Sequence, residues 1–503
     1  MSGKLSRREF LKGSVAVAVT AGALAAIPGV TAATLVPERK PNVIYIFADQ
    51  LRSQALGCYG DKQARTPNLD RLAAEGARFN NAISTWPVCS PYRGMLITGR
   101  YPMSNGVIEN NRPLWDGQET VATVLKAQGY ATGYIGKWHL NGGEGKNPTG
   151  DRRFGFDYWV GPNEYPMFKG QQWRPEKQTD DAIGYIKAHK DKPFCLFMSW
   201  NPPHDPYIAP DRFMSMFPKT QMELRPNVAE KELVKEQLAK HPLPSGSTEA
   251  KKRARWRERL DSDTGVREIL SGYYAATAGL DACMGRIMDA IKEAGIENDT
   301  ILVFSSDHGD MLGSHRMCLK QEPFEESISV PFIVRYPRHV PASTQTDALI
   351  SPVDVMPTLL ALAGVPCPES VEGISVAEAT RGMGSDQQDA VLIMKMMPGG
   401  NPWAVNAATE WRGVRTKTHT YARLADGGPW VLFDNRADPG QMKNLIDDPA
   451  HKKLQDDMEA TMQRLLKKAH DPFDTRKITQ QIDEQTKTKL RAAPKSRKVK
   501  DTD

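Results

Sequence analysis

The chain has 503 residues, of which 40% are hydrophobic and 25% are charged, and this is the composition of an ordinary globular protein. Its six cysteines are too few and too scattered for a disulfide scaffold, and no stretch after the N-terminus is apolar enough to span a bilayer. The formal charge of +6 comes from residues 1–33 and 487–503, which are basic, so the rest is nearly neutral. A near-neutral body argues against nucleic-acid binding.

The N-terminus has the features of an export signal. Arg7 and Arg8 precede a run of small apolar residues at 15–27, and a small-residue stretch at 30–33 suits signal peptidase. Paired arginines before a weakly hydrophobic segment resemble a twin-arginine signal, and the run is too short and too rich in alanine and glycine for a membrane anchor. We predict a signal peptide at 1–33, twin-arginine export machinery as a partner, and a periplasmic or extracellular protein that is not integral to the membrane.

The body alternates predicted strands and helices. Short runs of apolar, β-branched and aromatic residues predict buried strands at 42–48, 130–136, 194–200, 301–305 and 330–336. Helices are predicted at 67–75, after a threonine cap, and at 274–294, where apolar residues have helical spacing. Strands separated by helices predict an α/β fold, doubly wound around a mainly parallel or mixed sheet.

The pattern changes at two places along the chain. Residues 211–265 are charged and have no strand signal, so we predict an insertion at the rim of the sheet. Short runs at 391–396, 411–415 and 430–433 predict a small antiparallel sheet, and 452–468 predicts a closing helix. The expected organisation is a large α/β domain at 34–384, a small α+β domain at 385–472, and a basic, disordered tail at 473–503.

Polar side chains follow four of the predicted strands. These residues are Asp49 and Gln50, Lys137 and His139, His204, and Asp307 and His308. The carboxyl ends of parallel strands meet at one edge of a sheet, where α/β folds place their sites. Each residue alone has an ordinary structural explanation, but four such strand ends together predict a functional site.

Four of these residues are potential metal ligands, namely Asp49, Gln50, Asp307 and His308. Three of the four would bind through oxygen, which favours Ca²⁺ or Mg²⁺ over a structural zinc ion. No cysteine pair or H-E-x-x-H motif supports zinc. One nitrogen ligand and two carboxylates leave Mn²⁺ as an alternative.

The segment from Cys89 to residue 100 carries the most specific signal. Ser90 and Pro91 resemble an N-cap and a first helical residue. Cys89 would then lie at a helix N-terminus, whose backbone donors stabilise an anion, and Arg93 could bind a tetrahedral oxyanion through two N–H groups. A buried structural cysteine and a thiolate phosphatase are alternatives, but such phosphatases surround this loop with glycines and usually lack a metal.

With these residues the sequence resembles the type I sulfatases of the alkaline-phosphatase superfamily. Their signature is C-x-P-x-R followed closely by T-G-R, and Cys89, Pro91, Arg93 and residues 98–100 match it. Further matching segments, in the family's order, are PNVIYIFADQLR, GYIGKWHL, NPPHDPY, SSDHGDMLGSH with Lys320 and FEES, and LFDNRADPGQMKNL. The resemblance covers almost all of the mature chain and implies the family's fold, a large α/β domain with a small C-terminal sheet.

The resemblance implies a role for each site residue. The metal would be held by Asp49, Gln50, Asp307 and His308 together with residue 89. Arg93 and Lys137 would steady residue 89 and the sulfate. His139 would be the base that releases sulfate, and His204 with Lys320 would bind sulfate and protonate the leaving oxygen. A maturation enzyme would oxidise Cys89 to formylglycine. Its hydrate has two hydroxyl groups, one to attack sulfur and one to expel the sulfate.

We therefore predict an exported, calcium-dependent sulfatase, a sulfuric ester hydrolase acting on a sulfated carbohydrate. Many family members have Asp-Asp in place of Asp49-Gln50 and Asn in place of His308, whereas the choline-sulfatase and phosphonate-monoester-hydrolase branches share the residues found here. A phosphonate monoester or phosphodiester hydrolase, or a choline-sulfatase-like enzyme, is the alternative. A non-catalytic binder of sulfated glycans would need neither Cys89 nor both lysines.

Overall fold

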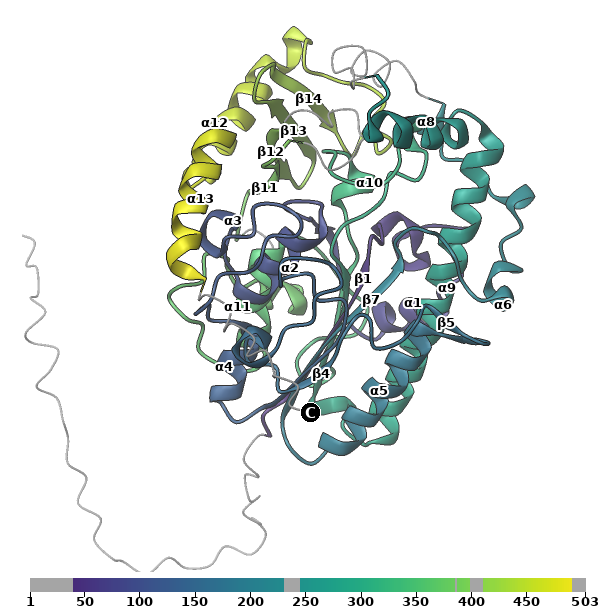
Figure 1. The fold of residues 1–503 in the computed structure, drawn as a ribbon, viewed down its shortest axis with the longest axis vertical. Helices are drawn as coiled ribbons and strands as arrows, with labels where there is room; N and C mark the ends of the chain where they lie inside the picture. The colour runs from purple at the N-terminus through teal and green to yellow at the C-terminus, as the bar shows by residue number, and fades with distance from the viewer. Residues whose placement is uncertain (1–38, 230–244, 385–386, 399–409, 491–503) are drawn as a thin grey trace, which may run out of the picture. The chain divides into compact units, whose positions relative to one another are not determined.

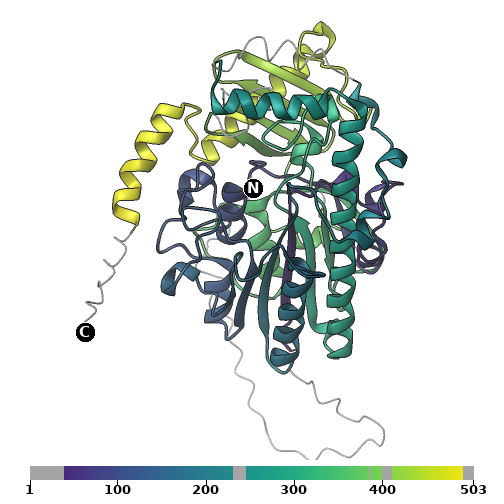
Figure 2. The same cartoon turned by 45° about the vertical axis from the view of Figure 1, so that its right-hand side comes forward.

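The computed structural model describes residues 39–229, 245–384, 387–398 and 410–490. The predicted signal peptide at 1–33 lies outside these ranges. Figure 1 shows a large sheet with helices on both sides and a smaller sheet above it, and Figure 2 shows both sheets from a second direction. No helix within the described ranges is long and apolar enough to cross a membrane.

The large sheet has eight strands in the order β10-β2-β9-β8-β1-β7-β3-β4. In chain order they are β1 (Asn42–Asp49), β2 (Ala77–Ala82), β3 (Ala131–Gly136), β4 (Tyr158–Val160), β7 (Phe194–Pro203), β8 (Thr300–Ser306), β9 (Phe332–Arg335) and β10 (Thr344–Ile350). Strand β9 runs antiparallel to β2 and β8, and the other neighbours are parallel. The sheet is therefore mixed and mainly parallel, which confirms the predicted fold class.

Strand β1 lies inside the sheet and is buried along its whole length. Its alternate side chains enter two hydrophobic cores on opposite faces, with Ile44 and Ile46 in one and Tyr45 and Phe47 in the other. A strand that is apolar on both faces needs a layer of helices on each side. The continuous apolar run of β1 thus accounts for its inner position, and that position brings the site to the middle of the sheet.

Helices cover both faces of the sheet (Figure 1). Helices α1 (Pro67–Ala74), α5 (Arg174–His189) and α9 (Asp263–Glu293) contribute to one core, and α2 (Cys89–Thr98), α4 (Val121–Ala127) and α11 (Pro352–Leu362) contribute to the other. Short elements are α3 (Pro102–Asn105), α6 (Asp211–Met214), α10 (Glu325–Ile328) and the hairpin of β5 (Phe168–Lys169) and β6 (Gln172–Trp173). This is the doubly wound arrangement that the sequence predicts.

The predicted insertion at 211–265 contains α6 and α8 (Thr248–Leu260) in its described part and no strand there. Residues 230–244 lie outside the described ranges. Helix α9 begins well before the predicted start at residue 274, because Ser262 caps it by accepting a hydrogen bond from the backbone N–H of Gly265 at 3.0 Å.

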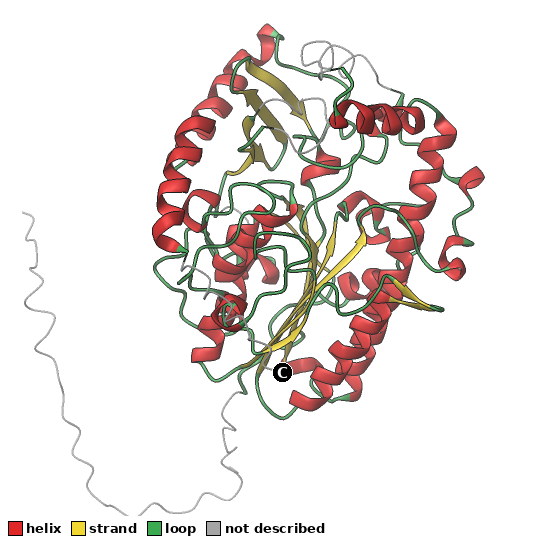
Figure 3. Cartoon of the chain, viewed as in Figure 1, coloured by secondary structure: helices red, strands yellow, loops and turns green. Residues whose placement is uncertain are grey.

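The C-terminal part forms a separate antiparallel sheet (Figure 3). Its strands are β11 (Ala390–Lys395), β12 (Trp411–Thr416), β13 (His419–Leu424) and β14 (Gly428–Asp434), paired in chain order. Helix α12 (Lys452–Lys468) has the predicted bounds and packs on this sheet through buried residues that include Met462. The small sheet and its closing helix are thus as expected, except that the sequence does not predict β13.

The prediction of a disordered tail at 473–503 is wrong for residues 475–489. These residues form helix α13 (Thr475–Lys489), and the side chain of Asp474 caps it by accepting two backbone N–H groups. Ile478 and Ile482 lie one turn apart and are fully buried in the small-domain core. The high charge of the segment conceals this apolar pair, because charge alone predicts a solvated chain. Residues 491–503 lie outside the described ranges.

Candidate active site

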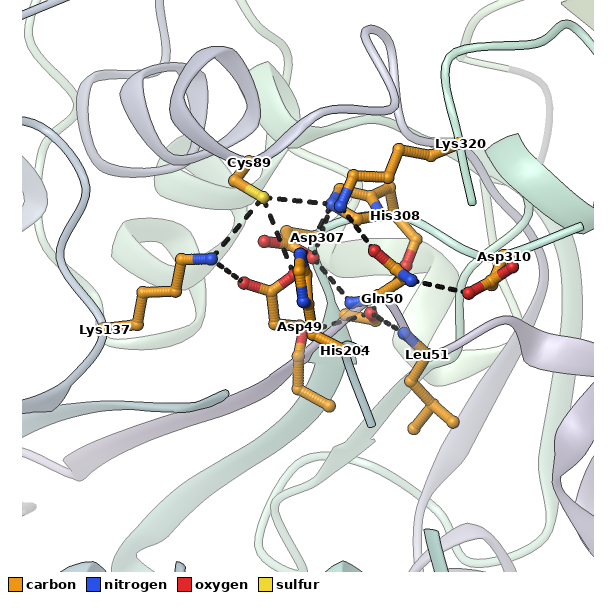
Figure 4. Close-up of polar contacts among 12 residues, drawn as sticks. Asp49, Gln50, Leu51, Cys89, Lys137, His204, Asp307, His308, Asp310 and Lys320 are labelled. Carbon is orange, nitrogen blue, oxygen red and sulfur yellow. Dashed lines mark hydrogen bonds and ion pairs between the residues drawn. The ribbon is translucent and has the colours of Figure 1, made fainter. Parts of the chain in front are cut away.

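The carboxyl ends of β1, β3, β7 and β8 lie at one edge of the sheet, because these strands run parallel in adjacent positions. Asp49, Lys137, His204 and Asp307, each at or just beyond one of these ends, therefore meet there. Cys89 lies opposite them at the start of α2 (Figure 4). The structure thus assembles the residues that strand-end reasoning brought together.

Asp49, Cys89, Asp307 and His308 form what we call the ligand cluster. Each is buried and offers one potential ligand atom, and these atoms all lie within 4.8 Å of one another. The Nε2 atom of His308 is 3.4 Å from Asp307 Oδ1 and 3.6 Å from Asp49 Oδ1. Two buried carboxylates this close to one imidazole and one thiol are a donor set that suits a divalent cation.

The electrostatics of the two carboxylates differ. Burial raises the pKa of both, but the positive charges of Lys137, His204 and Arg93 hold the pKa of Asp49 well below its usual value. The pKa of Asp307 remains raised, because burial and the charge of Asp49 outweigh the nearby cations. The cations of the protein therefore do not fully balance the negative charge of Asp307, and a bound metal ion would do so.

Arg93 ties the two carboxylates to the sheet. Its Nη2 lies 2.8 Å from Asp307 Oδ2 and 3.2 Å from Asp49 Oδ2. Its Nη1 donates to the backbone oxygen of Lys137 at 2.5 Å and to Ser199 Oγ at 2.8 Å. Arg93 is 1% exposed, and both terminal nitrogens of its guanidinium group are engaged, so it fixes the positions of the two acids.

Gln50 connects the ligand cluster to Lys320. Its backbone N–H donates to Asp307 Oδ1 at 3.0 Å, and its φ of 72° turns the side chain out of line with β1. The side-chain oxygen accepts a hydrogen bond from the Lys320 ammonium group, and the side-chain nitrogen donates to Asp310 Oδ2 at 2.5 Å. Asp310 also accepts from the hydroxyl of Tyr207 at 2.8 Å. This chain of contacts orients the amide oxygen of Gln50, the atom with which it could bind a metal.

Cys89 is the first residue of α2, and Val88 is its N-cap. The helix therefore begins two residues earlier than predicted, because the predicted N-cap is Ser90. The Cys89 sulfur lies 3.3 Å from His308 Nε2, 3.6 Å from Asp49 Oδ1 and 3.7 Å from Lys137 Nζ. This places the most reactive atom of the segment against two cationic groups and at a helix N-terminus.

The thiol of Cys89 is strongly acidified in this setting. Burial and the Asp49 carboxylate raise its pKa, but Lys137, Lys320 and His308 outweigh them and hold the pKa well below its usual value. An anionic atom is therefore stable at this position. The same surroundings would stabilise an oxygen anion attached to the same carbon.

Lys137 pairs with acids on two sides. Its Nζ lies 2.6 Å from Asp49 Oδ2 and 2.8 Å from Glu144 Oε1. Burial lowers the pKa of Lys137, but Asp49, Cys89 and Glu144 more than reverse this and keep the amine protonated. Lys137 therefore presents a permanent positive charge to the sulfur of Cys89.

His139 is held next to the site by two hydrogen bonds, one to its backbone and one to its ring. Its carbonyl oxygen accepts from Ser90 Oγ at 2.7 Å, and its Nε2 lies 2.9 Å from Asn111 Oδ1. Its Nδ1 is buried and has no hydrogen-bond partner among the described residues. Asn111 therefore fixes the ring and leaves one nitrogen available for a proton.

His204 reaches the ligand cluster from the segment after β7 (Figure 4). Its backbone N–H donates to the carbonyl oxygen of Asp49 at 3.1 Å. Its Nδ1 lies 2.9 Å from the carbonyl oxygen of Asp205 and 3.2 Å from Asp205 Oδ1, and the side chain is 21% exposed. Asp205 thereby orients the imidazole and leaves Nε2 as the nitrogen for other partners.

Sequence reasoning missed four residues that contact the site: Asn111, Glu144, Ser199 and Asp310. Ser199 lies near the end of β7, and Asp310 comes two residues after His308, so both could have been found from their place at a strand end. Asn111 and Glu144 come from irregular segments without periodic signals. Only the folded chain brings them to the site.

The sulfatase family model matches residues 41–365, which contain all of these site residues. This chain belongs to the sulfatase family. A second model, the C-terminal part of N-sulphoglucosamine sulphohydrolase, matches residues 313–468 and covers most of the small domain of this sulfatase.

Known sulfatases match the chain over most of its length. An ulvan-active sulfatase from Formosa agariphila is 34% identical over 460 residues, covering 87% of this chain and 83% of that protein. An N-acetylglucosamine-6-O-sulfatase from Bacteroides thetaiotaomicron is 26% identical, covering 86% of this chain and 87% of its own length. The crystal structure of yidJ from Bacteroides fragilis matches with a TM-score of 0.71 and 30% identity, covering 88% and 98% of the two chains. The sulfatase is thus a sulfuric ester hydrolase with an alkaline-phosphatase-like fold.

Proposed function

We propose that this sulfatase removes sulfate from a sulfated carbohydrate and that its nucleophile derives from Cys89. The observation that carries the proposal is the position of the Cys89 sulfur, 3.3 Å from His308 Nε2 and 3.7 Å from Lys137 Nζ at the N-terminus of α2. A sulfate group at this point would have its oxygens between cations and helix N–H groups. The names of the two relatives, one ulvan-active and one acting on N-acetylglucosamine-6-O-sulfate, support a saccharide substrate.

Oxidation of Cys89 to formylglycine by a maturation enzyme is part of the proposal. In its hydrated form this residue supplies two hydroxyl groups on one carbon, one for attack on sulfur and one for release of the sulfate. A plain thiol has no second hydroxyl and would remain blocked after one turnover. The support is the C-x-P-x-R context of residues 89–93.

The proposed metal is Ca²⁺, with Mg²⁺ or Mn²⁺ as alternatives. Asp49, Gln50, Asp307 and His308 would hold it together with residue 89, and three of these four side chains offer oxygen. The ion would supply positive charge that polarises the sulfate oxygens. The raised pKa of Asp307, caused by burial and by Asp49, supports a cation at this place.

The proton transfers fall to the side chains around the ligand cluster. His139 has a buried Nδ1 without a partner and would take the proton whose loss releases sulfate. His204, oriented by Asp205, would give a proton to the leaving oxygen, and Lys320 would assist it. Arg93 and Lys137 would hold the negative charge of the reacting groups in place.

Export through the twin-arginine route completes the proposal, and Arg7 and Arg8 before the apolar run at 15–27 support it. Replacement of both arginines by lysine should leave the precursor in the cytoplasm, as measured by fractionation and immunoblotting. Delivery of that variant to the periplasm would indicate another route.

Side-by-side assays test the reaction class. We expect the highest kcat/KM on sulfated saccharides, lower values on a phosphate monoester, a phosphodiester and a phosphonate monoester, and formylglycine at residue 89 by mass spectrometry. Cys89→Ser is the matched control, since it keeps the size of the side chain and should lose turnover. A preference for the phosphonate or phosphodiester would favour the alternative hydrolase, and saccharide binding without turnover would favour a glycan binder.

A further inference from the structure

A cavity of about 260 Å³ adjoins the reaction centre on the side of Lys137. Its polar lining consists of Lys137, Glu144, Asn163, Arg174, Gln178 and Asn201. Lys137 belongs to both places, because it lines the cavity and its Nζ lies 3.7 Å from the sulfur of Cys89. A group bound in the cavity is therefore next to a sulfate bound at residue 89.

Arg174, the first residue of α5, is the unusual member of this lining. It is half-buried, and its guanidinium group has no ion pair or hydrogen bond with any described residue, while its Nε is fully buried. Glu144 lies in the same cavity but pairs with Lys137 at 2.8 Å. Burial lowers the pKa of Arg174, and the charge of Glu144 offsets this only in part. A half-buried arginine that forms no ion pair can bind an anion through its guanidinium group.

Two further groups in the cavity are free to bind a polar ligand. The side-chain oxygen of Gln178 is buried without a hydrogen-bond partner among the described residues. Asn201, which lies in β7 where its register with β1 shifts between Trp200 and Pro203, has no side-chain hydrogen bond within the described chain. Hydroxyl groups of a sugar could satisfy both. The volume lies just below the range of about 300–1,000 Å³ that is typical of small-molecule sites, so it suits a single sugar unit.

We propose that this cavity is a subsite for a second anionic group on the saccharide that carries the scissile sulfate, and that Arg174 binds this group. The group is a carboxylate or a second sulfate, since both present the paired oxygens that a guanidinium group binds. The inference rests on the proposed function and adds to it a substrate class, acidic saccharides with a second negative charge beside the sulfate ester. Arg174 is then a specificity-determining residue.

Inhibition of sulfate-ester hydrolysis tests the subsite without knowledge of the natural saccharide. The hydrolysis of 4-nitrophenyl sulfate, or of whichever sulfated saccharide is turned over, is measured with added glucuronate, glucose 6-sulfate or glucose. The wild type and Arg174→Gln are compared, and Arg286→Gln is the matched control, because Arg286 pairs with Asp180 on the exposed surface of α9. The two sugar anions distinguish a carboxylate from a second sulfate.

We expect one or both sugar anions to inhibit the wild type and Arg286→Gln better than glucose does. Arg174→Gln should weaken this inhibition by about 10- to 100-fold, as for the loss of a hydrogen bond to a charged group. Uninhibited hydrolysis of 4-nitrophenyl sulfate should keep its kcat in the control Arg286→Gln, because that side chain lies on the exposed surface. Asn201→Asp, which adds a negative charge to the cavity and leaves Arg174 in place, should weaken inhibition by the anions and not by glucose, and it decides the matter if Arg174→Gln does not fold.

Equal inhibition by the anions and by glucose, or unchanged inhibition in the variants, would overturn the subsite while leaving the sulfatase reaction intact. Absence of turnover of every sulfate ester by wild-type protein that carries formylglycine would instead contradict the proposed function.

Discussion

The carboxylate of Glu144 lies 2.8 Å from the ammonium group of Lys137, whose other side pairs with Asp49 at 2.6 Å. The side chain of Lys137 is 2% exposed and that of Glu144 is 57% exposed. Glu144 therefore reaches Lys137 from the solvent side of the site. A sulfate ester that binds Lys137 has to compete with this carboxylate.

Glu144→Gln should lower the KM for a sulfate ester by about 2- to 5-fold, as expected for the loss of one competing exposed charge, and should leave kcat unchanged. Steady-state kinetics at low ionic strength measure the effect, and added salt should reduce it. Glu164→Gln, an exposed substitution on a neighbouring segment, is the control. A raised KM in Glu144→Gln would show that Glu144 helps to hold the substrate.

Asp307→Asn should lose the bound metal and reduce kcat/KM by at least about 100-fold. The amide keeps an oxygen that can accept the N–H of Gln50, so the change removes charge more than shape. Elemental analysis after dialysis gives the metal content, and Asp347→Asn on the surface is the control. Full metal content with full turnover in Asp307→Asn would exclude this carboxylate as a ligand.

His204→Ala should slow hydrolysis of a sugar sulfate by about 10²–10⁴-fold and have a much smaller effect on an activated aryl sulfate. A sugar alkoxide needs a proton as the S–O bond breaks, whereas a nitrophenolate leaves without one. The comparison of kcat/KM for the two substrates in wild type and variant cancels general damage to the fold. Equal losses on both substrates would remove His204 from the acid role and leave Lys320 as the candidate.

Asp281 provides a test of pH-dependent stability away from the site. It is buried on α9 and accepts the backbone N–H groups of Asn68 at 3.0 Å and Leu69 at 2.8 Å in the first turn of α1. Burial raises its pKa to about 6, despite these hydrogen bonds. Between pH 6 and 4 the folded state thus takes up a proton that the unfolded state has not yet bound, so this residue adds stability as the pH falls.

Asp281→Asn should therefore be more stable than wild type at pH 7.5, by at most about 3 kcal/mol, and this advantage should disappear by pH 4. Urea unfolding at a series of pH values measures it, with Asp289→Asn on the exposed face of α9 as the control. A variant whose relative stability does not change between pH 4 and 7.5 would contradict the raised pKa.

The inner strands could be predicted from the sequence, and the outer ones could not. Strand β1 is apolar on both faces, so its pattern is unambiguous. Strands β2 (ARFNNA) and β10 (TQTDALI) pair with each other toward one edge of the sheet and carry exposed polar residues, so they lack that pattern. Their place in the sheet depends on partners more than 250 residues away, such as Thr344 beside Ala77.

Some residues of the site could likewise be predicted from the sequence, and others could not. Asp49, Asp307 and His308 follow directly from strand ends, and the motif around Cys89 identifies the nucleophile position. Glu144 and Arg174 have no such signal, because the first lies in a glycine-rich segment and the second begins a helix with ordinary amphipathic spacing. Local patterns therefore indicate the reaction centre, while the surroundings that select a substrate depend on how distant loops pack.

Cys89 is 1% exposed, and all ten residues of α2 are buried. A maturation enzyme needs to hold the residue and several of its neighbours in its own active site, and no part of this helix is accessible once the sheet and its helices have closed around it. The proposed oxidation would therefore have to occur on the unfolded chain, before α2 is buried. If the proposed oxidation is required, a molecule that folds with an unmodified thiol would stay inactive, and only its unfolding would expose Cys89 to the maturation enzyme again.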